Sequence, residues 1–246
     1  IYCKTPQAQP ILGHYMPLQV IEFTPEELLG PLNEVERKNA PAKLYGAGNK
    51  NLLSHGPRVS IVGSRKCSPN GLQTTKAITA ALSVRGVVII SGLAEGIDTV
   101  AHTTAIECCG HTIAVLGTPL DKPYPAQNRA LFDVIAKDHL VLSQFRIGTA
   151  TIPGHFPMRN RTMALIADAT IIVEAGEDSG SLHQGWEALR LARPLFIGEK
   201  FFTNPALKWP KEMARYGAQA ISLDTLDVIF ENLPERTGDG PVSIAI

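Results

Sequence analysis

The sequence predicts an α/β fold: an extended Rossmann-like, open and mainly parallel sheet with helices on both faces. Short runs rich in Val and Ile alternate with amphipathic stretches between residues 58 and 200, which is the pattern of successive strand–helix–strand units. These apolar runs span four or five residues and show little alternation of polar and apolar side chains. Such runs are typical of parallel strands that are covered on both faces.

The elements follow in a regular order along the chain. Thr24 followed by Pro25 indicates an N-cap with proline at the first helical position, so a short helix is expected there. Strands are predicted at 59–62, 87–91, 112–116, 139–142, 169–173 and 194–197, and helices at 70–85, 96–108, 126–137, 158–167 and 181–192. A helix around 205–216 and a strand at 219–223 follow. We therefore predict an N-terminal extension (1–57), a Rossmann-like domain (58–233) and a polar tail (234–246).

Composition narrows the possible functions. The 246 residues are 44% hydrophobic and 19% charged, as in an ordinary globular protein. Lys plus Arg and Asp plus Glu both number 23, so a nucleic-acid ligand requires basic residues that are gathered locally. Four cysteines, two of them adjacent, do not form a disulfide framework, which favours a reduced, cytoplasmic setting. Since no apolar run approaches about 18 residues, we expect no membrane association.

Three turns that contain glycine and serine each follow a predicted strand and lead into a predicted helix. They are Gly63-Ser64-Arg65, Ser91-Gly92-Leu93 and Ser179-Gly180-Ser181. The first N–H groups of a helix lack intrahelical partners and, with the helix dipole, favour an anion. Because the carboxyl ends of parallel strands share one edge of the sheet, the three turns predict a phosphate-binding surface there. Simple turns without a ligand are the alternative.

Basic residues gather beside these turns. The stretches 58–66 and 145–161 each contain three Lys or Arg residues and no acid. In the second stretch, Pro157 suits the first position of a helix, which puts Arg159 and Arg161 in the first turn beside the positive end of the dipole. That arrangement calls for a bound anion or for an acidic partner such as Glu174 or Asp178. The loop at 117–125 is expected to form a further wall.

The sequence lacks the motifs of several common nucleotide-binding, catalytic and metal sites. The chain has neither the G-x-x-x-x-G-K-[ST] phosphate loop nor the G-x-G-x-x-G dinucleotide turn, and Ser91 is not in a G-x-S-x-G frame. Cys108, Cys109 and His111 have no second cysteine pair at zinc-type spacing, so buried thiols are the better interpretation. We therefore expect no catalytic residues, no metal and no cofactor.

Taken together and in this order, the segments resemble the DNA-processing protein A family, also called DprA or Smf. The matching segments are 42–49, 60–66, 91–98, 112–117, 124–128, 155–161 and 173–182, which cover about residues 40–185. The resemblance implies a Rossmann-like domain that binds single-stranded DNA, helps to load a RecA-type recombinase, forms a homodimer and has no enzymatic activity. It also implies a set of DNA- or phosphate-binding residues: Gly63, Ser64, Arg65, Lys66, Ser91, Gly92, Lys122, Asn128, Phe156, Arg159, Asn160, Arg161, Ser179, Gly180 and Ser181.

The chain departs from the family pattern after Leu182, where His183-Gln184-Gly185-Trp186 replaces a threonine–alanine pair. Two alternatives to DNA binding stay open. One is a nucleoside-monophosphate phosphoribohydrolase that resembles the LOG family, although Gln184 cannot supply the carboxylate that such hydrolysis needs, and Glu187 lies one turn further on. The other is a nucleotide-sensing module without catalysis.

Overall fold

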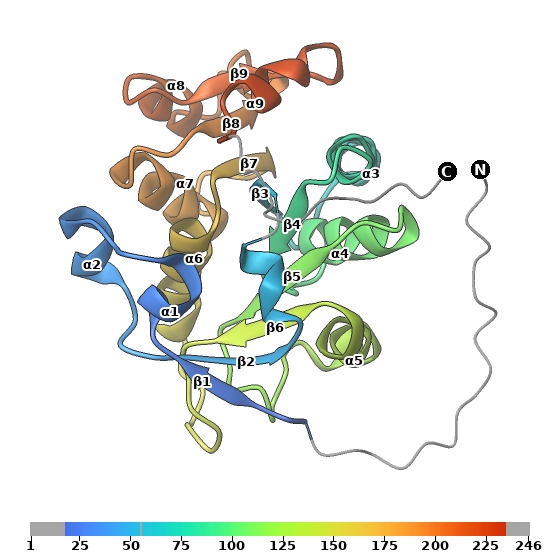
Figure 1. Ribbon diagram of the computed structural model, residues 1–246. Coiled ribbons are helices and arrows are strands. Elements are labelled where there is room, and N and C mark those ends of the chain that lie inside the picture. The colour runs from blue at the N-terminus through green and yellow to red at the C-terminus, as the bar shows by residue number, and fades with distance from the viewer. Residues whose placement is uncertain (1–17, 55, 235–246) are drawn as a thin grey trace, which may run out of the picture.

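One sheet organises the molecule. Its strands are β1 (Ile21–Phe23), β2 (Leu44–Gly48), β3 (Arg58–Gly63), β4 (Val88–Ser91), β5 (Thr112–Leu116), β6 (Leu140–Ser143), β7 (Ala169–Glu174), β8 (Leu195–Gly198) and β9 (Gln219–Ile221). In the computed structural model, which describes residues 18–54 and 56–234, these nine strands pair in the order β1-β2-β6-β5-β4-β3-β7-β8-β9 (Figure 1). The seven strands β6-β5-β4-β3-β7-β8-β9 pair in parallel throughout. Strands β1 and β2 add an antiparallel edge beside β6. The predicted mainly parallel sheet is confirmed.

The strand order reverses at β3. From β3 the chain adds β4, β5 and β6 on one side, then returns to add β7, β8 and β9 on the other side. In open α/β sheets, ligands bind in the crevice outside the carboxyl ends of the strands at such a reversal. The topology therefore predicts a ligand-binding site at the carboxyl ends of β3 and β7.

Helices cover both faces of the sheet, as predicted. They are α1 (Pro25–Leu29), α2 (Glu34–Asn39), α3 (Pro69–Ser83), α4 (Ile97–Glu107), α5 (Arg129–Asp138), α6 (His155–Ile166), α7 (Ser181–Arg190), α8 (Trp209–Ala214) and α9 (Asp227–Glu231), with short 3-10 helices at Lys50–Leu53, Ala126–Asn128, Glu199–Phe201 and Leu223–Thr225. In Figure 1, α3, α4 and α5 lie to the right of the sheet, and α6 and α7 to the left. Neighbouring strand residues serve opposite faces: Ile61 packs with α3 and α4, whereas Val62 packs with α6. No helix among the described residues is both long enough and apolar enough to cross a membrane.

The segment before residue 58 is joined to the sheet, since β2 pairs with β6 and β1 pairs with β2. The short helix expected after Thr24 is present as α1, and a capping box of Thr24 with Glu27 closes its start. The domain boundary at residue 57 stays a prediction, and residues 235–246 of the predicted tail lie outside the described chain.

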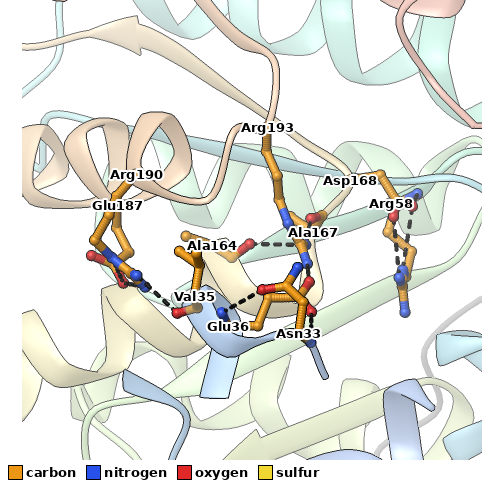
Figure 2. Close-up of polar contacts among 10 residues, drawn as sticks. All are labelled: Asn33, Val35, Glu36, Arg58, Ala164, Ala167, Asp168, Glu187, Arg190 and Arg193. Carbon is orange, nitrogen blue, oxygen red and sulfur yellow. Dashed lines mark hydrogen bonds and ion pairs between the residues drawn. The ribbon is translucent and has the colours of Figure 1, made fainter. Parts of the chain in front are cut away.

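Two arginines fasten α2 to the body of the protein (Figure 2). Arg193 donates from Nη2 to Glu36 Oε1 at 2.8 Å and from Nη1 to the carbonyl oxygens of Ala164 and Ala167 at the end of α6. Arg190 donates to the carbonyl oxygen of Val35 at 2.9 Å. Because one guanidinium ties α2 to α6 and the other ties it to α7, the exposed helix has a defined position.

The structure corrects the prediction for Arg58, which was counted with the basic residues near the first turn. Its Nη2 lies 3.1 Å from Asp168 Oδ1, and the side chains of the two residues are 4% and 8% exposed (Figure 2). The charge of Arg58 is therefore neutralised inside the protein and is not directed at the carboxyl edge of the sheet.

Some elements differ from the prediction. Helix α6 begins at His155, three residues earlier than expected, so Pro157 is the third helical residue. Strand β2, with the sequence LYGAG, was not predicted, because glycine and alanine have low strand propensity. It forms because Gly46 lets the strand lie close to Leu142 and Phe23, where a β-carbon would sit 2.9 Å and 3.3 Å from their side chains. Tertiary packing overrides local preference at this edge.

Candidate functional site

A cavity of about 690 Å³ lies where the strand order reverses. The turn after β3, the first turns of α6 and the turn between β7 and α7 form its walls. The predicted residues that line it are Gly63, Ser64, Arg65, Lys66, Phe156, Arg159, Asn160, Ser179, Gly180 and Ser181. The fold thus gathers residues from three distant parts of the sequence at one edge of the sheet.

The first turn does not offer its helix start to a ligand. Ser68 caps α3 by accepting a hydrogen bond from the N–H of Gly71, and Glu174 lies beside it. The carboxylate of Glu174 accepts from the N–H of Ser68 at 2.8 Å and from its hydroxyl at 2.6 Å. The protein's own carboxylate therefore takes the place that the sequence analysis assigned to a phosphate. Only the exposed side chains of Arg65 and Lys66 face the cavity with positive charge from this turn.

Gly63 has a packing role. A β-carbon there would lie 2.7 Å from Cγ1 of Ile97 and 2.8 Å from the carbonyl oxygen of Glu174. Glycine is thus required where β3 meets α4 and β7.

A second carboxylate closes the second turn. Asp98, in the first turn of α4, accepts from the N–H groups of Gly92 at 3.1 Å and Ala94 at 3.3 Å. Asn128 donates to the carbonyl oxygen of Leu93 at 2.8 Å and to Oγ1 of Thr99 at 2.8 Å, which braces the same turn. The sequence analysis missed the role of Asp98, although an acid in the first turn of a helix is itself a signal.

The third turn presents the start of α7 to the cavity. Gly180 is the N-cap of α7 and offers no side-chain cap, and a β-carbon there would meet nothing within 4 Å. Asn160 fixes this turn by donating to the carbonyl oxygen of Gly180 at 2.9 Å, and the hydroxyls of Ser179 and Ser181 lie 2.7 Å apart. The positive end of the α7 dipole and two hydroxyl groups therefore face the cavity.

Arg159 lies beneath the cavity and is 5% exposed. Its Nη1 donates to the carbonyl oxygen of Val115 at 3.0 Å. Burial lowers the pKa of its guanidinium, and the charge of Asp98 opposes that shift. Burial likewise raises the pKa of Asp98, against the effect of Arg159. The charges of Arg159 and Asp98 therefore act on each other, whereas Glu174, one of the acids expected from the sequence to pair with an arginine, binds Ser68. No ion pair within the described chain joins Arg159 to Glu174 or to Asp178.

The cavity is lined by equal numbers of basic and acidic residues. The basic ones are Arg65, Lys66 and Arg159, and the acidic ones are Asp98, Glu177 and Asp178. Asp98 binds backbone N–H groups, and Glu177 accepts from the N–H of Lys208. The Arg65 guanidinium carbon lies 5.6 Å from the ring centre of Phe156, which also meets Tyr124 edge to face. Arg65 and the α7 N-terminus therefore offer positive charge to the cavity, and the ring of Phe156 lies beside Arg65.

Other predicted residues lie outside this cavity. Within the described chain, Gly92, together with Tyr124, lines a smaller neighbouring cavity of about 40 Å³, whereas Ser91, Lys122, Asn128 and Arg161 line neither. The hydroxyl of Ser91 is buried and donates to the carbonyl oxygen of Ile61 at 2.7 Å. The loop at 117–125, which was expected to form a further wall, lines the smaller cavity through Gly117, Tyr124 and Pro125 and does not line the larger one. Contact of any of these residues with a ligand stays a prediction.

Residues 183–184, where the sequence departs from the family pattern, lie in the wall of the larger cavity. His183 and Gln184 both line it. Gln184 is fully buried and donates from Nε2 to Oγ of Ser60 at 2.6 Å, so it also ties α7 to β3. Glu187 is bound to Arg190 at 2.5 Å. Among the described residues, no group of three or more His, Cys, Asp or Glu side chains is arranged to hold a metal.

Fold and cavity together define an α/β protein of the Rossmann-like class, whose ligand position is the crevice at the reversal of strand order. The model of one family, DNA recombination-mediator protein A, matches residues 23–234. The chain belongs to this family. It is 37% identical over 196 residues to the DNA processing protein DprA of Bacillus subtilis, and 43% identical over 166 residues to that of Streptococcus pneumoniae. These matches cover 80% and 68% of this chain, but 65% and 58% of the relatives' length.

Solved structures agree with this assignment. DprA from S. pneumoniae superposes with a TM-score of 0.74 at 32% identity, covering 88% of this chain and 75% of that one. DNA processing protein A from Helicobacter pylori, whose structure was studied for its single-stranded DNA binding mode, superposes with a TM-score of 0.75 at 27% identity, covering 89% and 99% of the two chains. The resemblance stated from the sequence and the expected fold class are both confirmed.

Proposed function

We propose that this chain binds single-stranded DNA by its phosphate backbone in the cavity at the reversal of strand order. The observation that carries the proposal is the α7 N-terminus, which has no side-chain cap and faces a wall that bears Arg65 and Lys66. Backbone N–H groups, hydroxyls and arginines grip phosphates without reading bases. Since the H. pylori relative is described by its binding of single-stranded DNA, that ligand is the best match for this surface.

The wider role follows the family. We propose that the chain protects single-stranded DNA and assists its loading onto a RecA-type recombinase in natural transformation or recombination, as a cytoplasmic homodimer without enzymatic activity. Because the chain spans about three fifths of the relatives' length, this role concerns the domain within the longer family architecture.

Fluorescence anisotropy tests the binding proposal directly. Labelled oligo-dT, a duplex of equal length and labelled mononucleotides are titrated at about 50 and about 200 mM salt. Single-stranded DNA is expected to bind best, and three phosphate contacts predict roughly a 20-fold loss of affinity between the two salts, because the slope for single strands is about −0.7 per contact. Equal binding of all three ligands, or no dependence on salt, contradicts the proposal.

The enzymatic alternative is tested separately. Glu187, the carboxylate nearest to the expected position, is tied to Arg190 and does not line the cavity within the described chain. We therefore expect no free base when the protein is incubated with nucleoside monophosphates. Release of free base would favour a phosphoribohydrolase instead.

A further inference from the structure

Two aromatic side chains form an exposed pair beside the cavity. Trp186 in α7 is 38% exposed, and Tyr216, just after α8, is 71% exposed. Their ring centres lie 5.5 Å apart in an edge-to-face arrangement at 78°. The other tryptophan, Trp209, is buried at 3% and packs against Phe201. Single exposed apolar residues are ordinary, but two large rings that order one another at the surface are a preformed stacking surface.

Helix α7 leads from the cavity to this pair. His183 lines the cavity, and Trp186 follows three residues later on the same exposed face of the helix. From Ser181 to Trp186 the helix rises about 7.5 Å, at 1.5 Å per residue. This length corresponds to about two steps of a stacked strand, each about 3.4 Å. A strand whose phosphate lies at the α7 N-terminus therefore reaches Trp186 within a few nucleotides.

Helix α8 forms a second, basic connection. At the rim of the cavity, Glu177 accepts from the N–H of Lys208, the N-cap of α8. From there to Tyr216 the chain carries three exposed basic residues, Lys208, Lys211 and Arg215, against one acid, Glu212. On the other side of Trp186, Glu187 and Arg190 neutralise each other. The segment from Lys208 to Tyr216 is thus net positive, as a surface that binds a phosphate backbone requires.

We propose that Trp186 and Tyr216 form a stacking platform for a base of the strand whose phosphate occupies the α7 N-terminus. The inference rests on the proposed function and extends its site beyond the cavity. Stacking on an indole tolerates every base, because each base has a π-face.

The test compares oligonucleotides of two lengths. Anisotropy is measured with oligo-dT of about 2 and about 12 nucleotides. The shorter one spans a single step of about 3.4 Å and does not reach Trp186, whereas the longer one is within the roughly 4–16 nucleotides that one binding module covers. Trp186→Ala is expected to weaken binding of the long oligonucleotide about 5- to 150-fold, as the loss of one base–aromatic stack predicts, and to leave the short one unchanged. Trp186→Phe retains most of the affinity. Val84→Ala, which removes a 73% exposed side chain after α3, serves as the matched control and changes neither.

Intrinsic fluorescence supplies a second readout in the unmodified protein. The long oligonucleotide quenches the emission of exposed Trp186, and the short one does not, while buried Trp209 contributes a constant background. If the wild type binds neither oligonucleotide, the proposed function itself fails. If it binds both, but Trp186→Ala binds the long one as tightly as the wild type does, only the platform is overturned. A change of oligomeric state in Trp186→Ala with unchanged DNA affinity assigns the pair to a second copy of the chain and also overturns it.

Discussion

The guanidinium of Arg159 packs directly on Gly92, so closely that a β-carbon at residue 92 would overlap Nη1. This contact joins the second turn to α6 and brings Arg159 within electrostatic reach of Asp98. The floor of the cavity is thus an arginine held between a carbonyl oxygen, a carboxylate and a glycine.

Gly92→Ala is expected to destabilise the protein by about 1–3 kcal/mol, because the added methyl group displaces a buried side chain. The free energy of unfolding in urea measures this. Gly176→Ala is the matched control: a β-carbon there meets nothing within 4 Å, so its effect stays within about 1 kcal/mol. Equal effects of the two substitutions would contradict the packing role of Gly92.

Arg65→Ala is expected to weaken binding of oligo-dT by about 1.5–3 kcal/mol, or roughly 10- to 150-fold, because a charge-assisted phosphate contact is lost. Arg65 is exposed, so the stability of the protein changes little. Arg146→Ala removes an exposed arginine of the loop between β6 and α6 and serves as the control. Anisotropy titration in which Arg65→Ala binds as tightly as the control would rule out the assigned phosphate contact.

Arg159 and Asp98 are expected to be energetically coupled. Arg159→Met alone leaves a buried carboxyl without its cationic partner and costs about 3–5 kcal/mol of stability. In an Asp98→Asn background the same change costs at least about 1 kcal/mol less, because no charge is then left unpaired. Urea unfolding of the two single variants and the double variant measures the coupling. Costs that add to within about 0.5 kcal/mol would show that the two groups act independently.

His102 is expected to make stability depend on pH. It is fully buried and its Nδ1 lies 2.7 Å from Oγ1 of Thr112, and burial lowers its pKa from 6.5 to about 3. Between those pH values the unfolded chain binds a proton at this residue and the folded protein does not. Stability is therefore lost as pH falls from about 6.5 towards 3, by up to about 1.4 kcal/mol per pH unit from this group.

Unfolding in urea at a series of pH values tests this dependence. His102→Gln removes the titrating group, so its stability falls less steeply with acid than that of the wild type, whatever its absolute stability. His183→Gln, at an exposed position, retains the wild-type slope. Identical slopes for wild type and His102→Gln would show that His102 is not the source.

Much of the fold was predictable because its strands and helices have characteristic local patterns of apolar residues. The six central strands and the helices between them lie within a few residues of their predicted positions, since buried parallel strands are short runs of Val and Ile. The start of α6 at His155 was less predictable. His155 stacks on Phe145 across the loop that precedes the helix, with ring centres 3.7 Å apart, and residue types and periodicity do not show that the two rings touch.

The amino-acid sequence alone determined the class of fold, the family and the turns that meet at one edge of the sheet. Only the tertiary structure decided which of these turns the protein's own carboxylates occupy. Glu174 accepts from the N–H and hydroxyl of Ser68 after the first turn, and Asp98 accepts from the N–H groups of Gly92 and Ala94 in the second. At the third turn, the start of α7 has no side-chain cap. The physical reason is that a helix N-terminus attracts any nearby anion, and a carboxylate brought in by another strand satisfies it as well as a phosphate does. Local sequence shows where a helix N-terminus attracts an anion, whereas the folded structure determines which anion lies there.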